Sequence, residues 1–424
     1  MDREAATSQA DAAPAEAGRR WLPPALGVRS FRWLWVSQWP VLLATWMQTV
    51  ALGYFVYAQT RSVTAVAVVS AADGIPSVAL SLVGGALADR YPRRRILLIT
   101  QSVLGASAGT LAVLASSGHA TLAAIAAVAA VFGSSSAVDL PTGQALVADL
   151  VERDLVLNAM ALTASALSVC RLVGPSLAGV LYAVAGPGAC FAALAIAYLA
   201  PITVLWLVIP DIAPPGGPER QRLLSGIRFG FGTALHEPLL RAVMAAGGVL
   251  SLLGVSYMPF LPVLARSHLH VGTAGLGVMY SVGGIGGLAG GLLLSGMGRG
   301  RGRRRLLVGG GALYALSLAT VARSTWLGWT LPALVGVSLA FVAINTTLTT
   351  VLQTDAPAAL RGRLLGLYAT LAAGLQPLGT LLYSVLGAAH LFDGVAVGAV
   401  LVGLAAIGVG ARANLSPAAA THPA

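Results

Sequence analysis

Two ionisable side chains stand inside long apolar runs of the sequence, where a charge is unusual. Asp73 lies in the run 66–88 and Arg171 in the run 158–185. An ionisable side chain in the bilayer interior costs at least about 2.5 to 3.5 kcal/mol on insertion scales, so both are functional candidates. At 1.5 Å per helical residue, both fall roughly 20 to 22 Å from the inner face of the membrane.

This shared depth predicts that Asp73 and Arg171 face a common cavity and act in proton coupling. Asp73 would alternate between pairing with Arg171 and carrying a proton, and proton entry would release the substrate. The alternatives are that Asp73 only lies near the wet outer end of its span and that Arg171 has a structural role.

A second set of polar and aromatic residues is a candidate lining for such a cavity. Broad apolar walls with few fixed polar groups suit an amphipathic ligand. Residues of this kind also bond neighbouring helices in any bundle, so helix packing is the alternative for each. The set consists of Gln38, Trp46, Gln48, Tyr257, Asn345, Thr346 and Gln376.

The elements that position these residues follow from composition. Hydrophobic residues make up 57% of the 424-residue chain and charged residues only 10%, and the mean hydropathy is +0.81. Soluble domains carry about 25% charged residues, so a soluble enzyme is excluded. Runs of about 20 apolar residues, each able to cross a bilayer, recur along the chain and predict twelve transmembrane helices.

The net charge of +11 is explained by topology. Every basic residue is an arginine, and nearly all arginines fall in alternate loops, with Arg61, Arg266 and Arg323 as the exceptions on the other side. Short cytoplasmic loops carry such an excess of basic residues. The distribution predicts cytoplasmic N- and C-termini in a bacterial inner membrane protein, and it removes the case for a nucleic-acid partner.

The domain organisation is predicted to be a repeat of two six-helix halves. RRRILLITQSVLGASAGTLAV from Arg93 resembles RRRLLVGGGALYALSLATVAR from Arg303. Two parallel repeats with a site between them are typical of secondary transporters. The predicted fold is an all-α integral membrane protein with twelve transmembrane helices in two six-helix pseudo-repeat bundles. Its parts are an N-terminal tail (1–30), an N-terminal bundle (31–210), a linker (211–240), a C-terminal bundle (241–411) and a C-terminal tail (412–424).

The loop GGALADRYPRRR after the second run contains glycine, acidic and basic residues at fixed spacing. Glycine at 84 and 85 permits close helix approach, and an acid at 89 can cap a helix N-terminus. A loop that only holds the topology is the alternative. Gly85, Asp89, Arg90, Arg93 and Arg94 fit the G-x-x-x-D-R-x-x-R-R pattern, and with it the chain resembles the major facilitator superfamily.

Within that superfamily the chain resembles the branch of enterobactin exporters and macrolide-efflux proteins. Four segments carry this resemblance: TWMQTVALGYFVY, LNAMALTASALSVCRLVGPSLAGVL, HEPLLRA and LRGRLLGLY. The resemblance implies alternating access and a cytoplasmic gate, in which Asp89 latches the two halves. Arg361 and Arg363 supply the opposing charges and Asp139 a second acid, which together would form a bistable ion-pair gate. LPTGQ after Asp139 lacks the arginine usual in relatives.

The fifth run contains a degraded form of the antiporter motif of this superfamily. Gly174, Pro175 and Gly179 stand at the expected places, whereas Cys170 and Ala178 replace two glycines. Small residues permit tight helix contact, and the proline is expected to bend the helix. The motif is associated with export.

The sequence therefore predicts a proton-coupled exporter of a small amphipathic molecule, such as a drug, a siderophore or a secondary metabolite. It predicts no catalytic residue, no metal and no cofactor, because the two cysteines form no metal pattern and no P-loop is present. The energy source is the proton motive force, the partners are the substrate, protons and the lipid bilayer, and the chain is expected to be monomeric. The rivals are an importer or uniporter of the same fold, a membrane sensor, and an intramembrane hydrolase using Ser107.

Overall fold

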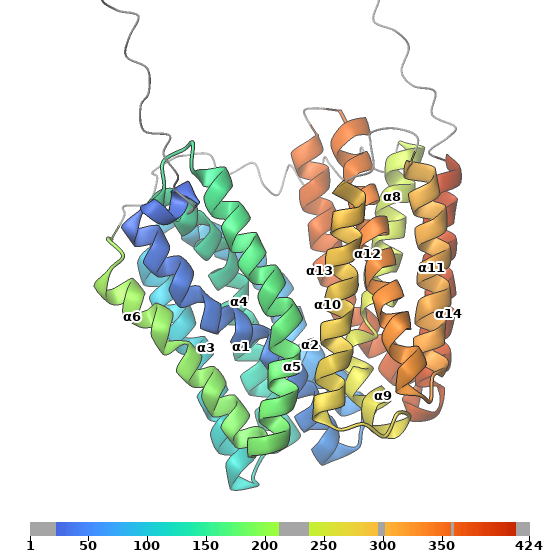
Figure 1. Ribbon diagram of the computed structural model, residues 1–424, viewed down its shortest axis with the longest axis horizontal. Helices are drawn as coiled ribbons and strands as arrows, with labels where there is room; N and C mark the ends of the chain where they lie inside the picture. Colours follow the sequence, from blue (N-terminus) through green and yellow to red (C-terminus); the bar gives the residue numbers. More distant parts are fainter. Residues whose placement is uncertain (1–22, 212–236, 296–301, 358–359, 413–424) are drawn as a thin grey trace, which may run out of the picture.

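The computed structural model describes residues 23–211, 237–295, 302–357 and 360–412, and these ranges form helices joined by short turns (Figure 1). Most of the predicted tails and of the predicted linker lies outside the described residues, and the first long helix, α1, begins at Arg29, inside the predicted N-terminal tail. The helices of the N-terminal part are η1 (Pro24–Gly27), α1 (Arg29–Thr60), α2 (Val63–Arg90), α3 (Arg93–Ser117), α4 (Leu122–Leu150), α5 (Val156–Ala197) and α6 (Leu199–Leu207). Those of the C-terminal part are α8 (Pro238–Val249), η3 (Leu250–Val255), η4 (Met258–Phe260), α9 (Leu261–Ser267), α10 (Thr273–Ser295), α11 (Arg303–Arg323), α12 (Leu327–Asp355), α13 (Arg361–Val385) and α14 (Gly387–Arg412).

Eleven helical segments of the described chain are long and apolar enough to cross a membrane. One of them, Val156–Leu207, has 52 residues, and at 1.5 Å per residue it is more than twice as long as the bilayer core of about 30 Å. Gly186 interrupts this segment with φ 81° and ψ 175°, a backbone conformation open to glycine. The chain reverses there, and the two arms account for the fifth and sixth of twelve crossings (Figure 1).

Turns between neighbouring helices are short and locally capped. The Ser62 hydroxyl accepts a hydrogen bond from the Ala65 amide at 3.2 Å at the start of α2. Thr121 caps α4 in the same way, through the Ala124 amide at 3.2 Å. Gly118 ends α3 with φ 70°, as glycine commonly does at a helix C-terminus. These caps satisfy backbone groups where the spans leave the apolar layer.

The helices form two bundles that stand side by side (Figure 1). Helix α2 packs on α4 and α1 on α5 in one bundle, and α11 packs on α12 and α14 in the other. The described chain begins and ends at the same end of the molecule, which is uppermost in Figure 1. We call this the arginine-rich end, because α3, α11 and α13 begin there with arginine, and we call the other end the far end.

The two bundles meet between mid-depth and the far end and diverge toward the arginine-rich end (Figure 1). Helix α5 packs on α10, α2 on α13, and α1 on α9. A β-carbon added at any of five glycines would press on the opposite bundle, so these helices approach one another closely. These glycines, which we call the interbundle seam, are Gly53, Gly74, Gly179, Gly277 and Gly284.

One pair of hydroxyl groups on α5 and α10 and another on α1 and α9 also cross the seam. The Ser176 hydroxyl donates to the Ser281 hydroxyl at 2.8 Å, and the hydroxyls of Tyr57 and Ser267 lie 2.6 Å apart. The described residues form no ion pair across the seam. At the seam, glycine backbone therefore lies against backbone and side-chain atoms of the opposite bundle, and neutral hydrogen bonds join the two bundles.

Candidate functional site

Two adjoining cavities lie between the bundles at mid-depth. The larger has a volume of about 530 Å³ and is lined from α1, α2, α4, α5 and α13, with Asp73 and Arg171 among its residues. The smaller, of about 200 Å³, extends into the C-terminal bundle. Arg171, Val255 and Met258 line both, so the two cavities form one continuous site.

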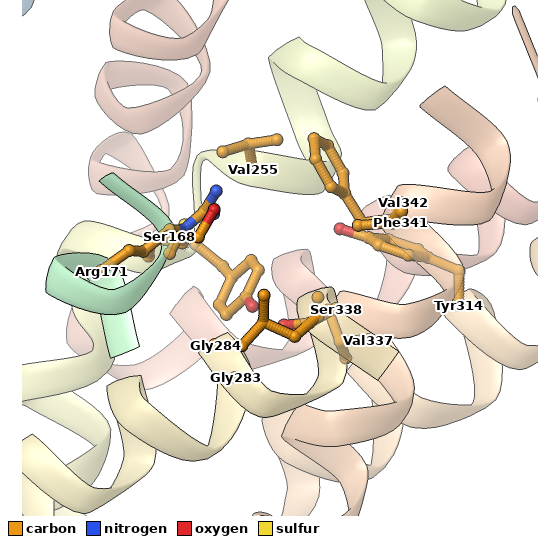
Figure 2. A pocket seen from close by; sticks show the side chains of 14 residues that line it. Ser168, Arg171, Val255, Gly283, Gly284, Tyr314, Val337, Ser338, Phe341 and Val342 are labelled. Atoms are coloured by element: carbon orange, nitrogen blue, oxygen red, sulfur yellow. The ribbon is translucent and has the colours of Figure 1, made fainter. Parts of the chain in front are cut away.

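Arg171 occupies the junction of the two cavities (Figure 2). Gly174 lies one turn later on α5, and a β-carbon there would stand 2.9 Å from the β-carbon of Trp46 on α1. The glycine therefore lets α5 approach α1. This brings the Arg171 guanidinium over the Trp46 ring, 5.1 Å from its centroid, in a cation–π contact.

Asp73 lines the larger cavity from α2. Gly133 on α4 lies against its backbone carbonyl, and a β-carbon at 133 would stand 2.8 Å from the Asp73 Oδ1 atom. This close contact between α2 and α4 fixes the depth of the carboxyl group. Among the described residues Asp73 forms no ion pair, and Arg171 likewise has none.

The seventh crossing is broken at the depth of the cavities. After α8 it passes through a π-helical stretch, Leu250–Val255, and a 3-10 turn, Met258–Phe260, before α9. The Ser256 hydroxyl donates to the Gln376 carbonyl at 2.9 Å, which ties the break to α13. Broken helices of this kind line binding sites in secondary transporters, and this one brings Val255, Tyr257 and Met258 to the site.

The seven predicted cavity residues divide into two groups. Trp46, Gln48 and Gln376 line the larger cavity, and Tyr257 lines the smaller one. Gln38, Asn345 and Thr346 line neither of these two cavities, and the Asn345 side chain instead accepts a hydrogen bond from the Tyr368 hydroxyl at 2.8 Å, between α12 and α13.

Part of the site was not predicted from the sequence. Figure 2 shows Arg171 and Ser168 on α5 at one side of the smaller cavity, and Tyr314 and Phe341 at the other. No signal in the sequence shows which way these side chains face. The broken seventh crossing did leave a signal in the sequence, because an apolar run is interrupted there by Gly254, Pro259 and Pro262.

At the arginine-rich end, the arginines between α2 and α3 bind within their own bundle. Arg93 forms an ion pair with Asp149 at the end of α4 and donates to the Ala145 carbonyl at 3.2 Å. Arg94 donates to the Leu205 carbonyl of α6 at 2.6 Å. The C-terminal bundle repeats the first arrangement, because Arg303 at the start of α11 pairs with Asp355 at the end of α12 at 3.1 Å.

Replacing Arg93 with glutamine is expected to destabilise the N-terminal bundle. The change removes a charged donor that joins α3 to α4, and hydrogen bonds to charged groups contribute about 1.5 to 3 kcal/mol. Unfolding of the purified chain in mixed detergent measures the loss. Arg95→Gln is the matched control, since Arg95 pairs with Asp211 at 2.8 Å at the surface, where such pairs contribute about 1 kcal/mol or less. Equal losses in the two variants would contradict this role for Arg93.

The described side chains of the predicted gate do not meet across the two bundles in this structure. The Asp139 carboxylate accepts a hydrogen bond from Thr100 on α3 at 2.5 Å, inside the N-terminal bundle. Arg361 donates to the Ala356 carbonyl at 3.0 Å, inside the C-terminal bundle, so the structure does not bring Asp139 and Arg361 together. Arg90 stacks over its neighbour Tyr91 at 5.9 Å. The side chains of the remaining gate residues lie outside the described ones: Gly85, Asp89 and Arg363.

The predicted helix-bending motif serves close packing on two sides of α5. Gly174 contacts α1, and Gly179 lies against the Thr273 backbone of α10. Pro175 is inside the continuous helix, and the Pro175 carbonyl would stand 2.6 Å from a β-carbon at Gly277. Gly186 has the non-helical backbone of α5, so the break is at this glycine, eleven residues after the proline.

Solved transporter structures share this architecture. A bacterial homologue of the iron transporter ferroportin, in an inward-facing state, matches with a TM-score of 0.72 and 14% identity over 91% of this chain and 99% of that one. A bacterial homologue of the human lysosomal transporter Spinster, inward-facing and unoccupied, matches with a TM-score of 0.68 and 13% identity over 93% and 97%. Identities this low show the fold alone.

Sequence comparison gives the family. The staphyloferrin A transporter of Staphylococcus aureus is 28% identical over 62% of this chain and 66% of its own length. The enterobactin exporter EntS of Escherichia coli is 28% identical over 68% of each chain, which confirms the resemblance predicted from the sequence. Residues 21–423 match the family model of the transmembrane secretion effectors. The chain therefore belongs to the transmembrane secretion effector family of the major facilitator superfamily, a family of multi-pass membrane transporters rather than enzymes.

Proposed function

We propose that this protein exports a small amphipathic molecule across a bacterial inner membrane in exchange for protons, by alternating access. One observation carries the proposal. Among the described residues, a carboxyl group and a guanidinium without ion-pair partners line one site between two bundles, and the bundles are in close contact between this site and the far end. Charges that are retained at such a depth are expected to act in transport.

The orientation follows the arginine distribution. The arginine-rich end is assigned to the cytoplasm, with both termini there, because basic residues accumulate in cytoplasmic loops. The interbundle seam then closes the outer side, and the structure corresponds to an inward-facing state. An exporter takes up its substrate in this state.

The energy source in this proposal is the proton motive force, and the chain acts as a monomer without a cofactor. A membrane potential of 100 mV is worth about 2.3 kcal/mol per charge, enough for roughly a fiftyfold gradient of a neutral substrate. Asp73 is the proposed proton carrier. The curated relatives transport siderophores by name, so siderophores are the first substrates to test.

The test uses inverted membrane vesicles with an acidified lumen and a fluorescent pH dye. Adding enterobactin or staphyloferrin A to vesicles that contain the protein is expected to raise the pH of the lumen, because each substrate molecule enters as protons leave. Asp73→Asn is expected to abolish this proton movement. Asp393→Asn is the matched control, since Asp393 is exposed at the far end and pairs with Arg323 at 3.1 Å.

Unchanged proton movement in Asp73→Asn would exclude Asp73 as the carrier. Equilibration of the substrate across the vesicle membrane with no change in lumen pH would favour a uniporter, because a uniporter cannot concentrate its substrate. Substrate movement in the opposite direction, out of the lumen, would favour an importer of the same fold.

A further inference from the structure

The charges of the central site define the chemistry of its ligand. Arg171 is an exposed side chain at the junction of the two cavities, and Asp73 lines the larger of them. The two residues share a cavity and yet form no ion pair with each other. Two opposite charges are therefore available, each for a separate group of a ligand.

Two neutral polar side chains of the same cavity add one donor and one acceptor. Among the described residues, the Trp46 Nε1 donor and the Gln48 Oε1 acceptor have no hydrogen-bond partner, and both residues line the larger cavity. Both atoms are themselves covered, so a ligand reaches them only after the side chains turn, and it then removes the desolvation cost that an unpartnered buried group carries.

The smaller cavity offers a different surface. Its walls include the aromatic rings of Tyr314 and Phe341 and the aliphatic side chains of Val337 and Val342, and glycines at 283 and 284 form part of its lining (Figure 2). Such walls suit a flat apolar or aromatic group. Arg171 lies at the mouth of this space, where it reaches an acidic group attached to the apolar one.

We propose that the ligand of this site is a zwitterionic amphiphile. Its acidic group binds the Arg171 guanidinium beside Trp46, its cationic group binds the Asp73 carboxylate, and its apolar body fills the smaller cavity. This inference rests on the proposed function and deepens it, because it names the class of molecule. It also agrees with proton exchange, since a proton on Asp73 removes the partner of the cationic group and releases the ligand.

The experiment compares four forms of one probe, 4-phenylphenylalanine. The free amino acid carries both charges, the N-acetyl form only the negative one, the carboxamide only the positive one, and the N-acetyl carboxamide neither. Calorimetry measures their binding to the full chain in lipid nanodiscs. The free form is expected to bind about tenfold to a hundredfold more tightly than either singly charged form, as for loss of one charged hydrogen-bonding partner.

Two substitutions assign the charges. In Arg171→Gln the free form is expected to bind no better than the carboxamide, and in Asp73→Asn no better than the N-acetyl form. Arg171→Lys is expected to keep part of the preference for the free form over the carboxamide. This result would show that Arg171→Gln acts by loss of charge and not by misfolding. Arg323→Gln and Asp393→Asn, at the exposed far-end pair, are the matched controls and are expected to leave all four affinities unchanged.

The inference is overturned if the N-acetyl carboxamide binds as tightly as the free form, or if the free form does not bind at its solubility limit. It is also overturned if Arg171→Gln leaves the preference intact in a folded protein. The proposed function fails separately, because proton movement in vesicles can be absent while the charge preference holds. Conversely, proton exchange driven by a singly charged or neutral substrate would refute the zwitterionic ligand and would leave the proposed function intact.

Discussion

Replacing Gly277 with leucine is expected to hold the two bundles apart at the far end and to remove the state that is closed there. A β-carbon at this position would stand 2.6 Å from the Pro175 carbonyl oxygen and 2.9 Å from the Ser176 α-carbon. Both are backbone atoms of a packed helix, so they cannot rotate away as a side-chain end does. The bundles must separate here to admit the leucine, and the population shifts toward forms that are open at the far end.

Distances between paired spin labels measure this shift. Labels at Gln59 and His270, on the two bundles at the far end, are expected to move apart in the variant. The two native cysteines, Cys170 and Cys190, are buried and are replaced by alanine beforehand. Transport is expected to fall strongly, because the variant no longer returns to the state that is closed at the far end.

Gly291→Leu is the matched control, since Gly291 lies on the same helix with open space around it. Its label distances and transport are expected to match those of the parent chain. If the distance between the spin labels in Gly277→Leu equalled that in the parent chain, contact at the seam would not be what closes the far end.

Gly379→Ala is expected to produce the largest loss of stability of any single methyl group added to α13. Gly379 is buried against the π-helical stretch, and a β-carbon would overlap the Leu252 carbonyl oxygen and the Ser256 hydroxyl. Overpacking of this kind costs about 1 to 3 kcal/mol, and a clash with backbone places this variant at the upper end. The free energy of unfolding in mixed detergent is the quantity to measure.

Gly366→Ala provides the comparison on the same helix. Gly366 is exposed, and a methyl group added there would meet open space, so alanine is expected to stabilise the helix by up to about 1 kcal/mol. Opposite signs for the two variants are the expected result. An equal loss of stability in Gly379→Ala and Gly366→Ala would contradict the tighter packing assigned to Gly379.

The sequence alone was sufficient for the architecture and for the central pair of charges. Apolar runs predicted the membrane spans, because the bilayer imposes one length on every crossing. Depth counting placed Asp73 and Arg171 at the same level of the membrane and so suggested a common cavity, and the structure has both residues lining one. Depth is a property of position along a helix, so it can be read without knowing how the helix is turned.

Helix rotation and fine packing could not be predicted in this way. Asn345 was placed in the cavity because it is polar, whereas its side chain bonds Tyr368. Asp139 was assigned to the gate from the family resemblance, and its gating role stays a prediction; in this structure it accepts a hydrogen bond from Thr100. Tyr314 lines the site, but the sequence around it does not indicate this. The neighbours of a side chain depend on contacts between helices that are distant in the sequence.

The glycines of the interbundle seam have a thermodynamic consequence for the cycle. Glycine has no side-chain rotamers to lose, so closing the seam freezes no side-chain torsion at the glycine positions themselves. Closing the far end at Gly179 and Gly277 therefore carries little side-chain entropic cost, and the side chains it does order include the hydroxyl pairs of Ser176 with Ser281 and of Tyr57 with Ser267. The equilibrium between the form that is closed at the far end and the form that is open there then depends mainly on what binds to Asp73 and Arg171.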